Sequence, residues 1–94
     1  MSAYIVARLF VTDSELLTEY GAAARATLKT READYLIRST TVETLEGDAP
    51  PTRVVVLRFP TREAALEWFN SEEYQVAAEG RRKASSGEIL LVEE

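Results

Sequence analysis

Apolar and polar positions along the chain follow a spacing that predicts four strands. Residues 3–11, 34–45 and 52–59 are rich in β-branched, aromatic and aliphatic side chains, as strands are. A last apolar run predicts a short strand over residues 88–92. The glycine and prolines of residues 47–51 separate the second and third strands, which predicts an antiparallel hairpin.

Between these strands, apolar residues recur every three or four positions, which predicts helices. The first helix has cap residues and an acid at positions 12–15, then an apolar stripe from Leu16 that ends near residue 29 or 30. Thr61 is a candidate cap for a second helix, and Ser71 is the candidate cap where that helix is interrupted and restarts. Residues 85–87, Ser-Ser-Gly, predict a loop before the last strand.

The resulting order is strand, helix, strand, strand, broken helix, strand. This order is typical of an α+β, ferredoxin-like βαββαβ fold, a four-stranded antiparallel sheet with its helices on one face. With 94 residues, the chain is long enough for one domain, residues 1–94.

The predicted strands carry apolar residues on both faces. Alternate residues of a strand point to opposite faces, so Ile5 and Leu9 fit a face that helices cover. The second face has an apolar set of its own: Tyr4, Val6, Phe10, Val54, Val56, Leu90 and Val92. Since two helical units cover only one face, we expect a second copy of the chain to cover the other. The prediction is a homodimer with its two sheets packed face to face.

Arginines interrupt this second face: Arg8, Arg58 and, if the register of the second strand places it there, Arg38. A buried guanidinium needs an acceptor, because an unpaired buried charge is very costly. One interpretation is structural ion pairs. The candidate partners are Glu43, Glu46, Glu93 and Glu94. The other interpretation is a pocket in which the arginines hold a carboxylate or other anion, with Tyr4 and Phe10 as its apolar wall.

Composition narrows the chemistry and the partners. The chain has no cysteine or histidine, which excludes disulfides, thiol and histidine-assisted nucleophiles, and Cys/His metal sites; we expect no metal and no cofactor. Its 11 basic and 16 acidic residues give a net charge of −5, and Arg81–Lys83 fit a helix C-terminus, so we expect no nucleic-acid partner. No segment has the apolar length of a membrane span or the pattern of a signal peptide, which favours a cytoplasmic protein.

A set of segments, in order, covers nearly the whole chain. They are residues 3–8, 11–13, 36–38, 42–47, 53–60 and 68–74. Together they resemble the bacterial family named domain of unknown function 1330. The resemblance implies the fold of the dimeric α–β barrel superfamily, which includes cofactor-free monooxygenases, muconolactone-type isomerases, haem-dependent chlorite dismutases and members with no known activity. Where that family often has an acid near the end of the third strand, this chain has Arg58, which favours an anionic ligand or a different pairing that uses Glu43 or Glu46.

Two functional hypotheses follow. The first is a binder of a small acidic organic molecule, or a cofactor-independent enzyme acting on one, with a pocket between helices and sheet or between two sheets. The candidate ligand-binding residues are Tyr4, Arg8, Arg38, Thr40 and Arg58. The second hypothesis is a non-enzymatic dimerisation module in which the arginines are structural. Trp68 and Tyr20 fit core packing, although a buried Tyr20 hydroxyl would need a partner, and no residue is identified as catalytic.

Overall fold

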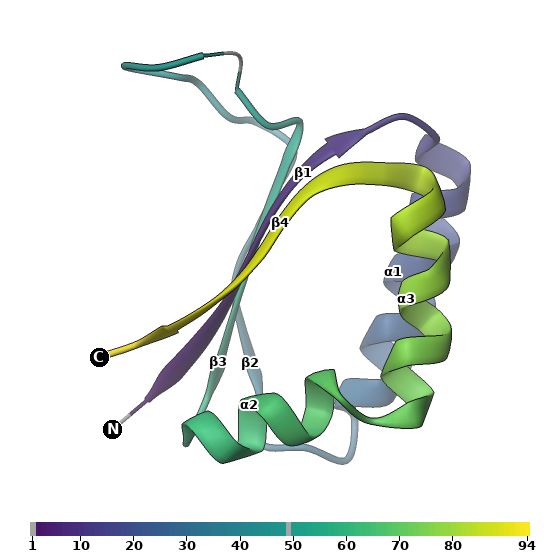
Figure 1. Ribbon diagram of the computed structural model, residues 1–94, viewed down its shortest axis with the longest axis vertical. Helices are drawn as coiled ribbons and strands as arrows, with labels where there is room; N and C mark the ends of the chain where they lie inside the picture. The colour runs from purple at the N-terminus through teal and green to yellow at the C-terminus, as the bar shows by residue number, and fades with distance from the viewer. Residues whose placement is uncertain (1, 49) are drawn as a thin grey trace.

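A computed structural model describes residues 2–48 and 50–94; Ala49, in the predicted loop, lies outside them. The elements are β1 (Ala3–Val11), α1 (Ser14–Leu28), β2 (Asp34–Ser39), β3 (Arg53–Phe59), α2 (Arg62–Phe69), α3 (Glu72–Ala84) and β4 (Ser85–Glu93). All strand pairs are antiparallel, in the order β2-β3-β1-β4, and the helices lie on one side of the sheet (Figure 1). The ferredoxin-like prediction is confirmed. Among the described residues, no helix has the length and apolar character needed to cross a membrane.

Side-chain caps begin all three helices. Asp13 accepts a hydrogen bond from the backbone N–H of Leu16 at 3.0 Å and so begins α1. Thr61 caps α2 in the same way, and Ser71 caps α3 through its bond from the N–H of Tyr74 at 3.2 Å. These bonds satisfy N–H groups that have no partner inside the helix. The predicted interruption of the second helix at Ser71 is therefore confirmed.

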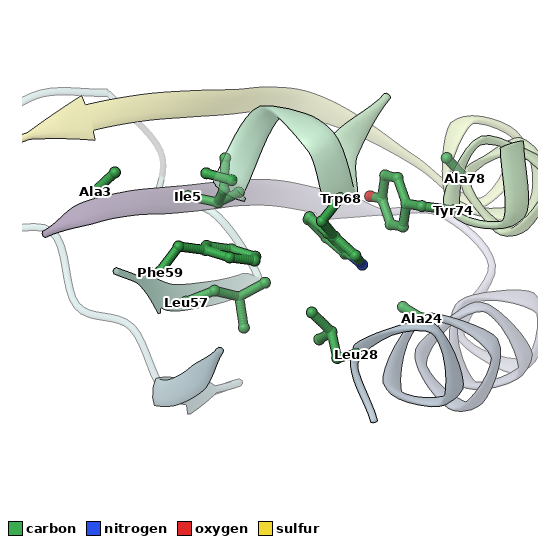
Figure 2. Packing of buried hydrophobic residues seen from close by; sticks show 10 residues of the cluster. Ala3, Ile5, Ala24, Leu28, Leu57, Phe59, Trp68, Tyr74 and Ala78 are labelled. Atoms are coloured by element: carbon green, nitrogen blue, oxygen red, sulfur yellow. The ribbon is translucent and has the colours of Figure 1, made fainter. Parts of the chain in front are cut away.

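Aromatic side chains form the centre of the core between sheet and helices. The Trp68 ring lies 5.6 Å from Phe59 of β3 and 4.1 Å from Tyr74 of α3, measured between ring centroids. All three side chains are almost fully buried, together with Ile5 and Leu57 from the sheet (Figure 2). Because these residues come from both sheet and helices, their burial fixes the distance between the two layers.

In the part of the chain that the structure describes, no helix covers the opposite side of the sheet (Figure 1). The apolar residues predicted for this side are partly or largely exposed, with Leu90 at 41% and Val92 at 43%. We call them the open face: Tyr4, Val6, Phe10, Val54, Val56, Leu90 and Val92. The observed registers place Tyr4 beside Val92 and Val6 between Val56 and Leu90, so the set is continuous across β3, β1 and β4.

The second strand is shorter than the sequence predicts, ending at Ser39 instead of residue 45. The Ser39 hydroxyl accepts a hydrogen bond from the N–H of Thr41 at 3.0 Å and donates to its carbonyl at 3.2 Å. Such local bonding competes with strand pairing. Residues 40–48, which we call the arm, leave the sheet and extend away from it on the side opposite the helices (Figure 1).

The predicted loop at residues 85–87 is also wrong, because β4 begins at Ser85, directly after α3. Ser86 lies opposite Phe10 and Gly87 opposite Leu9. Gly87 has a φ of 131°, and a Cβ atom there would lie 2.0 Å from the carbonyl oxygen of Arg8. The residue signals a close backbone approach inside a strand rather than a turn.

Strand β2 contains a β-bulge that the sequence did not indicate. Tyr35 lies opposite Leu57, but Ile37, two residues later, lies opposite Val56, so Leu36 is an extra residue. After a bulge, side chains point to the face opposite the one that simple alternation predicts. The bulge therefore decides which residues of β2 face the helices.

Candidate functional site

A narrow pocket lies between the helix-covered face of the sheet and helices α1 and α3. Its lining residues are Ile5, Ala7, Leu9, Tyr20, Gly21, Ala24, Arg25, Tyr35, Arg38, Arg53, Val55, Leu57, Trp68, Tyr74 and Ile89. The cavity volume is about 40 Å³. A single water needs roughly 10–15 Å³ by the same measure, so the pocket has room for a small or slender group.

A pair of tyrosine hydroxyls lies in the largely apolar wall of the pocket. The Tyr20 and Tyr74 oxygens lie 2.8 Å apart, within hydrogen-bonding distance. Burial, and to a smaller extent Tyr74, raise the pKa of Tyr20 above its ordinary value of 10.0, so this hydroxyl keeps its proton into the alkaline range. The Trp68 indole N–H donates to Thr27 at 2.9 Å instead of into the pocket. The expectation that a buried Tyr20 hydroxyl needs a partner is confirmed.

Three arginines from different elements line the pocket: Arg25 of α1, Arg38 of β2 and Arg53 of β3. The Arg38 guanidinium carbon lies 5.9 Å from the Tyr35 ring centroid. Burial raises the pKa of Tyr35, and the positive charges of the three arginines oppose that rise. Within residues 2–48 and 50–94, only other arginines form ion pairs with carboxylates. Arg25, Arg38 and Arg53 form none there. The pocket opening is therefore positive in a chain whose net charge is −5.

The bulge places Arg38 at this opening. Arg38 lies opposite Val55, which packs against the core under the helices. Directly opposite residues in an antiparallel pair share a face. The register of β2 therefore does not place Arg38 on the open face with Arg8 and Arg58.

The other predicted arginines lie on the opposite side of the sheet, and each has an acidic partner. Arg8 pairs with Glu88, and Arg58 donates to Asp34 at 3.0 Å. These are not the predicted partners, because neighbouring strands supply the acids directly: Glu88 is opposite Arg8, and Asp34 is opposite Arg58. Of the predicted acids, Glu93 pairs with Arg62, and Glu94 accepts from Tyr4.

The remaining candidates, Tyr4 and Thr40, do not meet the pocket arginines. The Tyr4 hydroxyl donates to Glu94 at 2.6 Å, and this bond, the largest cause, raises the Tyr4 pKa. Thr40 is exposed just beyond the end of β2 and is absent from the pocket lining. The structure therefore brings Arg38 together with two arginines that sequence reasoning missed, and separates it from the other candidates.

A signal for one missed residue was present in the sequence. Arg53 has the same strand parity as Val55 and Leu57, so alternation alone places it on the helix-covered face. Arg25 has no comparable signal, because it lies on an exposed part of α1 and reaches the pocket by folding back beside Gly21. A Cβ atom at Gly21 would lie 3.3 Å from the Arg25 Nη1 atom.

Comparison with known proteins gives one family match and several structural neighbours. Residues 2–94 match the model of the family described as Domain of unknown function (DUF1330). No curated protein matches the chain.

Solved structures share this fold at low sequence identity. A protein of unknown function from Rhodopseudomonas palustris, RPA0582, is 14% identical, with a TM-score of 0.78 over 99% of this chain and 82% of its own. SnoaB, a cofactor-independent oxygenase from Streptomyces nogalater, is 16% identical, with a TM-score of 0.72 over 99% and 92%. HapK from Hahella chejuensis is 14% identical, with a TM-score of 0.63 over 98% and 91%. At these identities the likeness establishes the fold alone.

Proposed function

This chain belongs to the family described as Domain of unknown function (DUF1330), and from that premise we propose that it binds a small acidic organic molecule in the pocket between sheet and helices. One observation carries the proposal: Arg25, Arg38 and Arg53 all line one largely apolar pocket and have no carboxylate partners among the described residues. We further propose that the protein is a cytoplasmic homodimer, joined through the open face.

The arginines suit a carboxylate. A guanidinium offers parallel N–H donors that match the two oxygens of a carboxylate, and it stays charged at every physiological pH. The apolar walls, among them Leu57 and Trp68, would exclude water from the ligand body. The acidic group would therefore lie at the opening and the apolar part inside.

The deep end of the pocket favours a ligand with an oxygen at its far end. The hydroxyls of Tyr20 and Tyr74 share one hydrogen bond, and since a bond between two hydroxyls uses one of their two protons, the other is free for a carbonyl or hydroxyl oxygen. The small free volume restricts the ligand to a slender or flat molecule. Because SnoaB has the same fold, a cofactor-independent oxygenation is the first reaction to assay on any ligand found.

Thermal unfolding in the presence of aromatic and aliphatic carboxylates tests the proposal, followed by calorimetric titration of those that raise the Tm. Saturating ligand stabilises the folded state by mass action. Arg38→Met should weaken binding about 10- to 100-fold, the effect of losing a charge-assisted hydrogen bond worth roughly 1.5–3 kcal/mol. Arg82→Met is the matched control, because Arg82 bonds to Gln75 on α3 and is absent from the pocket lining.

Two outcomes would contradict the pocket assignment. If no carboxylate raises the Tm, the chain has no such site. If Arg58→Met abolishes binding and Arg38→Met does not, the ligand lies on the open face.

The second candidate function is a non-enzymatic dimerisation module. The ion pairs of Arg8 with Glu88 and of Arg58 with Asp34 favour it, since they neutralise the charges that flank the open face. A dimer that forms normally and binds none of the tested acids would support this second function over the first.

A further inference from the structure

We propose that the arm, residues 40–48, lies against the second copy of the chain and completes the contact between the two subunits. This inference rests on the proposed homodimer and names a part of the interface beyond the open face. It requires that the arm be placed on the dimer side of the sheet, that it have apolar surface to contribute, and that the open face alone be too small.

The arm stands on the required side. It leaves the end of β2 and extends away from the helices, on the side of the open face (Figure 1). A groove runs between arm and sheet, and its lining is part apolar and part charged. The apolar part is Val6, Phe10 and Val54 of the open face with Val42 and Leu45 of the arm, and the charged part is Arg8 with the acids of the arm. Since open-face residues form one wall of the groove, a second copy covering that face would also meet the arm.

The arm has apolar surface with nothing packed over it. Leu45 is 89% exposed, the highest value among the large apolar residues described in the structure. Its neighbours Glu43, Glu46 and Asp48 are exposed acids. Equal charges repel, so two acidic arms are unsuited to pairing with each other. The body of the second subunit is therefore the surface that the arm contacts.

Area shows why the arm is needed. Each open-face side chain would lose about 40–60 Å² on association, roughly 300–400 Å² per subunit for the set. A stable protein interface buries about 800 Å² per partner. About 56–65% of such an interface is apolar, roughly 450–520 Å² per partner. The open-face set falls short of this by roughly 50–200 Å², and the arm lies next to it with Leu45 exposed.

Photo-crosslinking tests where the arm lies. Because the chain has no cysteine, Leu45→Cys gives a single attachment point for a benzophenone maleimide. Irradiation should produce covalent dimers, with the crosslink between the label at position 45 of one subunit and a peptide of the other. The control is Val76→Cys, labelled identically, because Val76 is 63% exposed on α3, on the helix side of the sheet. Crosslinks from position 45 only to its own chain would overturn the inference, since the arm would then close over its own sheet.

Sedimentation of Leu45→Asp gives an independent measurement. A C2 dimer contains two copies of each contact, so the dimer Kd should rise about tenfold or more, whereas Val76→Asp should leave it unchanged. An unchanged Kd for Leu45→Asp would overturn the role of the arm while the homodimer stands. A wild-type chain that sediments as a monomer would overturn both.

Discussion

At the scale of single residues, the buried tyrosine hydroxyls connect the pocket to stability. Tyr20 and Tyr74 bond to each other across α1 and α3, against a core built mainly of apolar side chains. Burial, with a smaller effect of Tyr74, raises the pKa of Tyr20 above its ordinary value of 10.0. The folded chain therefore holds this proton at a pH where the unfolded chain releases it.

This difference predicts a loss of stability in alkali. Below pH 10 the contribution of Tyr20 is fully present, and above pH 10 the free energy of unfolding should fall by up to about 1.4 kcal/mol per pH unit for this one group. Urea unfolding at pH 9, 10 and 11 measures the slope. Tyr20→Phe should be less stable than wild type at pH 9, because the Tyr74 hydroxyl loses its partner. Above pH 10, however, the variant should lose less unfolding free energy per pH unit than wild type, since it lacks the contribution of Tyr20. Equal slopes in the two proteins would show that Tyr20 does not cause the effect.

Residue type and strand parity predicted part of the candidate site. Arginine was recognised as the residue type that would hold an anion, and parity correctly assigns Arg8 and Arg58 to the open face. Arg38 required knowledge of the bulge in β2, which depends on pairing with β3 and leaves no local mark in the sequence. Predicting Arg25 as a pocket residue would have required knowing that its side chain folds back beside Gly21. Spacing along a helix does not determine that conformation.

At the scale of elements, local hydrogen bonding explains which boundaries could be predicted. The caps Asp13, Thr61 and Ser71 act within three residues of themselves, so the sequence alone indicates where the helices begin. The end of β2 depends on a choice between pairing with β3 and the local bonds of Ser39 with Thr41. A run of strand-forming residues does not show which of these is favoured.

The junction of α3 and β4 yields a prediction at the same scale. Gly87→Ala should destabilise the fold by about 2 kcal/mol or more, because its Cβ would lie 2.0 Å from the Arg8 carbonyl oxygen and its φ is 131°. Gly47→Ala is the matched control: its φ is 117°, but a Cβ there meets nothing within 4 Å, so only the conformational cost of about 1 kcal/mol remains. Urea unfolding of the two variants separates the close approach from the backbone angle. Equal losses would contradict the close approach.

At the scale of the whole molecule, the sheet has one face under helices and one face of apolar side chains in contact with solvent. A domain of 94 residues buries only about 60–65% of the surface of its unfolded chain, so cover on the second face would add a large share of its stability. The subunit fold and its assembly should therefore be coupled. The Tm is expected to rise with protein concentration, as it does when only the folded state associates.

The position that tests this coupling most directly is Val56, at the middle of β3 and beside Val6 of β1. Wild type should sediment at twice the 10.5 kDa mass of the chain at micromolar concentration, and Val56→Asp should sediment as a single chain. In the dimer, an aspartate there would place a charge without a partner between two apolar faces, which costs several kcal/mol. In the monomer the cost is small, because position 56 is in contact with solvent. The circular dichroism of the variant should stay that of a folded chain, with a Tm that no longer depends on concentration. A Val56→Asp protein that remains dimeric would mean that the open face is not the interface, because the charge would then lie in solvent in both states.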